Sequence, residues 1–152
     1  MFASPWMWTD ENGVKATFAR WRGSVVVTTG FYASCTVRCP MTIAKLREID
    51  EALRAHGRSA EFVLVTIDPD NDTVDRLRRL KASRDLPSSW HLLHGSREDT
   101  YDFGRWLHLN IARDSGHMDH DAKIAVFDSS GRLVRSFEGW NFDESDILAT
   151  LH

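Results

Sequence analysis

Cysteine is scarce in this chain, with only Cys35 and Cys39 among 152 residues. Two cysteines are too few for a disulfide scaffold, and a domain of this length can bury a hydrophobic core without one. No apolar run approaches the roughly 18 residues that a transmembrane helix needs. Basic residues are not in excess, since the net charge is −3. We therefore do not expect a nucleic-acid partner.

A recognisable targeting signal is also missing. The first residues, Met1 to Trp6, show no basic region followed by an apolar core, so no signal peptide is visible. A chain trimmed of its targeting segment would look the same, so this feature does not decide the location. Hydrophobic residues make up 42% and charged residues 27% of the chain, as in an ordinary globular domain. We expect one domain over residues 1–152.

Hydrophobic periodicity and turn residues predict an alternation of strands and helices. Asn12-Gly13 is a strong hairpin-turn signal, and apolar residues from Ile43 to Leu53 recur at the spacing of one helix face. Gly57 is suited to end that helix. The first half of the chain is predicted to contain a hairpin over 6–18, a strand over 24–29, an exposed turn over 30–34, a helix over 41–56 and a strand over 62–67. A helix capped by Asn71 or Asp72 follows, then a strand over 89–94 and a helix capped by Ser96 with Asp99 as its capping-box partner. The chain is predicted to end with a loop over 110–121, a hairpin over 123–137 and a helix over 143–151.

This order of elements predicts an α/β fold. Strands and helices alternate in the middle of the chain, which favours parallel strands joined by right-handed crossovers. The final hairpin adds antiparallel strands, so the expected sheet is mixed, with helices on both faces and a separate N-terminal β-hairpin. A pair of cysteines at the top of the first strand–helix unit matches the thioredoxin-like architecture.

The chemistry of the chain centres on Cys35 and Cys39, at the predicted start of a helix. Residues four apart on a helix have Cα atoms about 6 Å apart, which is within the range that a disulfide tolerates. A helix N-terminus and the adjacent Arg38 both favour the thiolate. The thiolate serves disulfide exchange and metal binding alike, so these residues alone leave both open. The pair cannot fill a tetrahedral zinc site, whereas two soft thiolates with a further ligand suit copper, and Cu(I) in particular.

A histidine-rich segment later in the chain offers the further ligand. His117, Met118 and His120 occur just before the strand that starts at Lys123. Imidazole and thioether groups are both suitable copper ligands. His120 is a candidate third ligand from its place at the start of that strand, with His117 and Met118 as second choices. The alternative, a solvated and charged loop, is the favoured interpretation for any lone loop histidine.

Three separated motifs resemble the Sco/SenC family of thioredoxin-fold copper chaperones. They are Cys35-Thr-Val-Arg-Cys39-Pro40, Asp68-Pro-Asp-Asn-Asp-Thr73, and Asp119-His120 ahead of an apolar strand. The resemblance implies that Cys35, Cys39 and His120 bind a copper ion. Thr36 and Arg38 depart from the family pattern, which has Pro after the first cysteine and an acidic residue before the second.

The resemblance also implies a partner and a location. The family assists assembly of the CuA centre, so the expected partner is the cytochrome c oxidase subunit that carries CuA, or another copper or thiol carrier protein. The expected location is periplasmic or otherwise extracytoplasmic, with a membrane anchor in the full-length protein, or the mitochondrial intermembrane space in a eukaryote. The anchor common in the family is not visible in this chain.

Two other functions use the same cysteines. The first is thiol–disulfide oxidoreduction, in which Cys35 and Cys39 are catalytic, reduce a partner's cysteines and do not need His120. The second is a peroxidase, which ranks last because no peroxidatic motif is evident. A metallochaperone rather than a turnover enzyme is the main expectation.

Several other residues have plainer interpretations. Asp68, Asp70 and Asp72 imitate the opening of a calcium-binding loop, but the later positions lack the required Gly and Glu, so we expect a helix-capping turn. Trp90, Phe103 and Trp106 are expected in the core. Trp6 and Trp8 are expected either to pack or to form an exposed partner surface.

Overall fold

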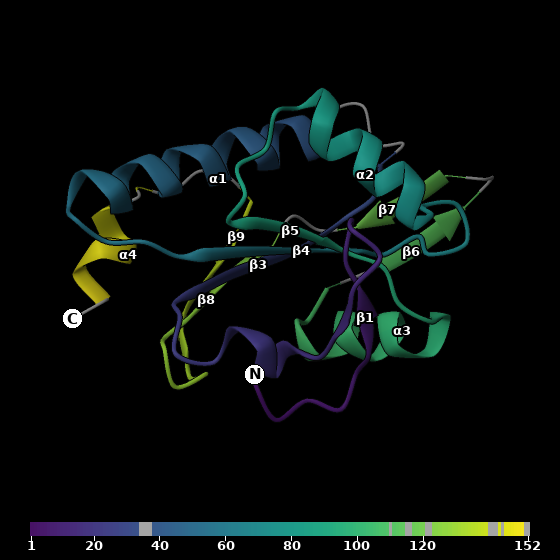
Figure 1. The fold of residues 1–152 in the computed structure, drawn as a ribbon, viewed down its shortest axis with the longest axis horizontal. Helices are drawn as coiled ribbons and strands as arrows, with labels where there is room; N and C mark the ends of the chain where they lie inside the picture. The colour runs from purple at the N-terminus through teal and green to yellow at the C-terminus, as the bar shows by residue number, and fades with distance from the viewer. Residues whose placement is uncertain are drawn as a thin grey trace.

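In the computed structural model, residues 1–33, 38–109, 111–114, 117–120, 123–139, 143 and 145–150 are described; for 38–39, 111–114, 117–120, 145 and 149–150 this covers the backbone alone. The centre is a five-stranded mixed sheet in the order β5-β4-β3-β8-β9 (Figure 1). Its strands are β3 (Val26–Phe31), β4 (Glu61–Thr66), β5 (Trp90–Leu93), β8 (Lys123–Phe127) and β9 (Leu133–Glu138). The first three are parallel, while β8 runs antiparallel to β3 and β9 antiparallel to β8.

Helices lie on both faces of this sheet (Figure 1), as expected for a thioredoxin-like fold. The helices are α1 (Arg38–Ala55), α2 (Val74–Ser83), α3 (Arg97–Trp106) and α4 (Ser145–Thr150), with a 3₁₀ turn η1 (Phe18–Trp21). Two small antiparallel pairs complete the fold, β1 (Trp8–Thr9) with β2 (Lys15–Ala16), and β6 (Ile111–Asp114) with β7 (His117–His120). No helix in the described part of the chain is long and apolar enough to span a membrane.

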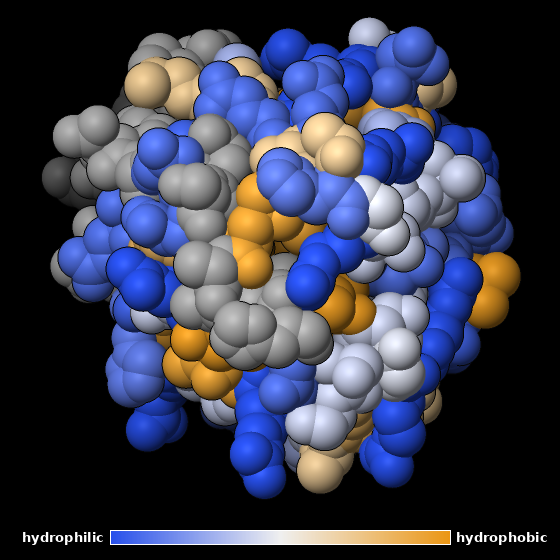
Figure 2. Space-filling model, turned by 90° about the vertical axis from the view of Figure 1, so that its left-hand side faces the viewer, coloured by the Kyte–Doolittle hydropathy of each residue, from blue (hydrophilic) through white to orange (hydrophobic). Residues whose placement is uncertain are grey.

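One face of the sheet is covered by α1, α2 and α4. The predicted apolar stripe of α1 is buried against the sheet, with Leu46, Ile49 and Leu53 almost fully inaccessible to solvent. Gly57 follows α1 with φ +69°, a conformation that glycine adopts at no steric cost, so its predicted role as a helix stop is confirmed. The face of the molecule in Figure 2, on the α4 side, is mostly hydrophilic with small hydrophobic patches, as expected when apolar side chains point inward.

The opposite face is covered by the N-terminal segment, η1 and α3, and it is rich in aromatic side chains. Trp6, Trp8, Phe18 and Phe103 are buried and pack mostly edge to face, while Trp106 is partly buried and stacks on Phe127. Trp6 and Trp8 therefore do not form an exposed partner surface. Of the three residues expected in the core, Trp90 and Phe103 are fully buried, whereas Trp106 only packs against it.

The N-terminal hairpin also closes the outer edge of β5. Thr9 and His94 exchange two backbone hydrogen bonds of 2.8 and 2.9 Å. Two residues along, the buried carboxylate of Glu11 accepts a hydrogen bond from the backbone N–H of Leu92 at 3.3 Å and forms an ion pair with Lys81 Nζ at 2.5 Å. The hairpin is thus fixed to both β5 and α2.

Two sequence-based expectations about secondary structure are wrong. The segment 110–121 is not wholly a loop, because β6 and β7 pair with each other from Ile111↔His120 to Asp114↔His117. The sequence gives no strand signal here, because both strands are polar and pair with each other rather than with the central sheet. Gly30 and Phe31 are not an exposed turn: they extend β3 in register with Val65 and Thr66, and the Phe31 side chain is buried.

Two capping details also differ. The N-cap of α2 is Thr73, whose hydroxyl accepts from the backbone N–H of Arg76, rather than Asn71 or Asp72. Ser96 caps α3 as expected, through the backbone N–H of Asp99. The Asp99 carboxylate, however, accepts a hydrogen bond from the backbone N–H of Met7 instead of completing a capping box.

Candidate metal and thiol site

The cysteine-bearing segment connects β3 to α1 at one end of the sheet. Strand β3 ends at Phe31, and α1 starts at Arg38, so Cys39 lies in the first turn of the helix as predicted. Cys35 and the side chains of Cys39, His117, Met118 and His120 fall outside the described part of the structure. The placement of the site therefore rests on the backbone and on the residues around it.

The segment that carries His120 returns to the same end of the sheet. Strand β8 is antiparallel to β3, with Ile124 in register with Thr29, so β8 begins where β3 ends. The Thr29 hydroxyl donates a hydrogen bond of 2.5 Å to the backbone carbonyl of Lys123, the first residue of β8. Lys123 is three residues after His120, so this bond fixes the start of β8 shortly after the β6–β7 hairpin in the chain.

The other end of the hairpin also contacts β3. A Cβ atom added to Gly30 would lie 2.7 Å from Leu109 Cδ1 and 3.0 Å from Ile67 Cγ2, closer than side chains normally approach. The absence of a side chain at Gly30 thus lets Leu109 pack against β3, two residues before β6 starts. Leu109 and Lys123, which flank the hairpin in the chain, therefore both contact the last residues of β3, and the cysteine-bearing segment follows β3 in the sequence.

This arrangement bears on two of the predicted ligands, Cys39 and His120, whose backbone is described. His120 is the last residue of β7 and pairs with Ile111 at the root of the hairpin, not at its tip. Cys39 is in the first turn of α1, and Cys35 follows β3 by four residues. Among the side chains that the structure describes, no group of three His, Cys, Asp or Glu residues lies close enough to hold a metal ion.

A buried aspartate, Asp72, holds the backbone at Ala33, which comes before the cysteines in the sequence. Asp72 Oδ2 accepts a hydrogen bond of 2.8 Å from the backbone N–H of Ala33, two residues before Cys35, and one of 2.7 Å from the Thr66 hydroxyl. Thr66 is the last residue of β4 and its hydroxyl in turn accepts from the backbone N–H of Asp68 at 3.1 Å. The turn after β4 is therefore connected through Asp72 to the segment after β3.

Asp72 has an electrostatically unusual environment. The residue is fully buried, and burial raises the pKa of its carboxyl group above the usual value, against the opposing effect of the two hydrogen bonds. No group in the described residues donates a hydrogen bond to Oδ1, whose nearest cation is Arg76 Nε at 3.9 Å. The predicted capping turn is thus also a support for the cysteine-bearing segment.

The other carboxylates of this turn are occupied by the protein itself. Asp68 accepts from the side-chain amide of Asn71 at 2.9 and 3.2 Å, and Asp70 forms an ion pair with Arg97 at 2.7 Å. Their partners are consistent with a structural turn rather than a calcium loop. The role of Asp72 was missed from the sequence, because the pattern of a capping turn does not show which backbone segment lies beside the turn. The one available signal is that Asp72 follows β4, the strand next to β3.

Comparison with known proteins identifies the family. The family model of SCO1/SenC matches residues 1–152. A SCO1 protein homolog of Bacillus subtilis is 20% identical over 95% of this chain and 78% of its own length.

Solved structures show the same fold. ScoI of Arabidopsis thaliana, solved with copper bound, has a TM-score of 0.86 and 18% identity, with 98% of this chain and 94% of that chain covered. A SCO1/SenC family lipoprotein of Bacillus anthracis has a TM-score of 0.85 and 22% identity, covering 94% and 88%. BsSco, described as having a disulfide switch and as belonging to the Sco family of cytochrome c oxidase assembly proteins, has a TM-score of 0.82 and 18% identity, covering 96% and 88%.

Proposed function

Since the chain belongs to the SCO1/SenC family, we propose that it is a copper-binding chaperone in which Cys35, Cys39 and His120 hold the metal. The observation that carries the proposal is the position of these segments at the end of β3. The cysteine-bearing segment follows that end in the sequence, and the residues on either side of the hairpin that carries His120 contact it, through Thr29–Lys123 and Gly30–Leu109.

The chemistry of the donor set supports copper as the cargo. Two thiolates and one imidazole are soft to borderline ligands, which suit Cu(I). The N-terminus of α1, an 18-residue helix, favours the thiolate form of Cys39 in its first turn. Transfer then requires only ligand exchange, in which a partner's thiolates replace Cys35 and Cys39 on the metal without a change of oxidation state.

The proposed partner is the cytochrome c oxidase subunit that carries CuA, or another copper or thiol carrier protein. Support comes from BsSco, a fold relative that belongs to an oxidase-assembly family. We further propose that the protein works outside the cytoplasm and is anchored to a membrane in its full-length form, in line with the lipoprotein of Bacillus anthracis that shares its fold.

A second candidate function is thiol–disulfide exchange at the same cysteines. In this reaction Cys35 or Cys39 attacks a partner disulfide as a thiolate, and the other cysteine resolves the mixed disulfide. The partner's cystine is reduced to two thiols while the Cys35–Cys39 pair is oxidised. The disulfide switch described for BsSco favours this candidate, which is compatible with copper binding because the metal requires the reduced pair.

The test is a Cu(I) titration of the reduced protein against a competing chelator. We expect weaker binding in Cys35→Ser and in His120→Ala than in the parent. A matched control is His56→Ala, since His56 is an exposed residue after the far end of α1. Parent-like affinity in both site variants would refute the ligand set. If His120→Ala loses copper but keeps disulfide exchange with a model protein disulfide, both functions are present and separable.

A further inference from the structure

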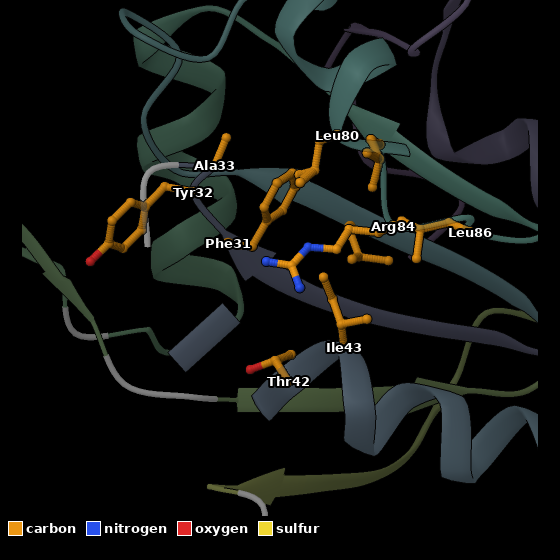
Figure 3. Close-up of a pocket in the computed structure, with 10 residues that line it drawn as sticks. Phe31, Tyr32, Ala33, Thr42, Ile43, Leu80, Arg84 and Leu86 are labelled. Atoms are coloured by element: carbon orange, nitrogen blue, oxygen red, sulfur yellow. The ribbon is translucent and has the colours of Figure 1, made fainter. Parts of the chain in front are cut away.

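A hollow lies beside the residues that follow β3. It is bounded by Ala33 after the end of β3, by Ile43 on α1, and by Leu80 and Leu86 on and after α2 (Figure 3). Phe31 forms part of its wall, and its interior amounts to about 20 Å³, room for about one water molecule. The hollow is therefore a small, mostly apolar recess, and Ala33 in its wall is two positions before Cys35 in the sequence.

A broader and shallower groove continues from this hollow along α2. It is lined by Ala33 and Leu80, which it shares with the hollow, and by Arg76, Arg79 and Ser83. The Arg79 side chain is 74% exposed and that of Arg76 is 42% exposed, so both guanidinium groups are accessible from solvent. The two depressions share Ala33 and Leu80 as walls, and the groove adds cationic side chains along α2.

The charge of this surface is opposite to that of the whole chain. The net charge of the protein is −3, yet the described residues that line the hollow and the groove include Arg76, Arg79 and Arg84 and no acidic residue. Figure 3 shows the Arg84 guanidinium extending over the hollow toward Phe31 and Ile43. Within the described part of the chain, no carboxylate pairs with Arg84, and the partner of Arg79 is the exposed Asp75 at 3.2 Å.

We propose that this surface, which we call the α2 groove (Ala33, Leu80, Arg76, Arg79, Ser83 and Arg84), docks an extended acidic segment of the partner protein. The inference rests on the proposed function, because the partner is the protein whose cysteines exchange metal or electrons with Cys35 and Cys39. An apolar side chain of that segment packs against Leu80 in the groove, and its carboxylates pair with Arg79 and Arg84. Docking there places neighbouring partner residues beside Ala33, which is two positions before Cys35 in the sequence.

Charge complementarity is the reason for choosing this occupant. Planar guanidinium groups recognise carboxylates through paired hydrogen bonds, and complementary charge mainly increases the association rate and selects the partner. A concave recess next to the cationic groups favours a chain with side chains over a flat anionic membrane surface. The same groove offers no acidic lining residue, so a basic segment is disfavoured.

The experiment measures fluorescence anisotropy of a fluorescein-labelled hexapeptide, Asp-Glu-Leu-Phe-Glu-Asp, with the reduced full chain. The groove variant is Arg79→Glu/Arg84→Glu. The matched control is Arg58→Glu/Arg105→Glu, which makes the same change in net charge at two exposed residues away from the groove. We expect peptide affinity at least about tenfold weaker in the groove variant and within about threefold of the parent in the control. A peptide with Ser-Ser in place of Leu-Phe should also bind more weakly.

Three outcomes would overturn the proposal: no saturable binding of the acidic peptide by the parent, equal losses in the groove and control variants, or stronger binding of a peptide with Lys at the four acidic positions. Sedimentation of the parent with vesicles containing anionic phosphatidylglycerol, lost in the groove variant while the peptide does not bind, would assign the surface to a membrane instead. Cu(I) titration of the same variants distinguishes failure of the docking proposal from failure of the copper-binding proposal. Peptide binding can fail while copper affinity stays at the parent value, and copper binding can fail in Cys35→Ser while the groove still binds the peptide.

Discussion

Replacing Asp72 by alanine should loosen the cysteine-bearing segment and destabilise the fold. The substitution leaves the backbone N–H of Ala33 and the hydroxyl of Thr66 without their shared acceptor, which lies 2.8 and 2.7 Å from them. A buried polar group left without a hydrogen bond costs about 1–3 kcal/mol. Two such groups, one of them able to relax toward solvent, should lower the free energy of unfolding by about 2–4 kcal/mol.

The neutral variant Asp72→Asn separates the hydrogen bonds from the charge. Its side-chain oxygen can still accept from Ala33 and Thr66, so we expect a smaller loss, of about 1 kcal/mol or less at neutral pH. Burial raises the pKa of Asp72, which means that the folded protein takes up the proton at a higher pH than the unfolded chain does. The resulting stability is fully present below the ordinary aspartate pKa and is lost as the pH rises through the raised pKa of the folded state.

The measurement is urea unfolding of the reduced proteins between about pH 4 and pH 8. The free energy of unfolding of the parent minus that of Asp72→Asn should increase as the pH falls. Asp75→Asn is the control, since Asp75 is 66% exposed in the first turn of the helix that follows Asp72. The reasoning fails if Asp72→Ala unfolds within about 0.5 kcal/mol of the parent, or if the difference between the parent and Asp72→Asn does not change with pH.

Two further predictions concern the supports of the site. Gly30→Ala should lower the free energy of unfolding by about 1–3 kcal/mol, because the added methyl group forces Leu109 away from β3. In a double-mutant cycle, Leu109→Ala in the same chain should recover part of that loss. Additive losses would contradict the contact between the two residues. Glu11→Ala should cost about 2–4 kcal/mol, because it leaves the ammonium group of Lys81 and the backbone N–H of Leu92 without their carboxylate; a thermal unfolding temperature equal to that of the parent would show that the hairpin is not fixed by this residue.

Much of the fold could be predicted from local patterns. Two examples are the β-branched run of β3 and the apolar stripe of α1. Both face the core, and the core requires apolar side chains at the positions that face it, so the sequence pattern reveals these elements. Strands β6 and β7 could not be found in this way, since their backbone groups are satisfied by each other and they show no apolar alternation.

The supports of the candidate site were equally hidden. The contacts of Asp72 with Ala33 and of Thr29 with Lys123 join residues 39 and 94 positions apart in the chain. No periodic pattern encodes such distances, because they depend on which strands become neighbours. The candidate ligands Cys35, Cys39 and His120 were identified by residue type and by resemblance to a family, and their geometry as ligands stays a prediction.

The N-terminal hairpin has a consequence for how copies of this protein behave in concentrated solution. An uncovered outer strand offers its N–H and C=O groups to another molecule, and such pairing is a common route to aggregation. Here the outward N–H groups of β5 at Leu92 and after it at His94 are already taken by Glu11 and Thr9. The hairpin therefore covers this edge of the sheet and prevents another strand from pairing with it.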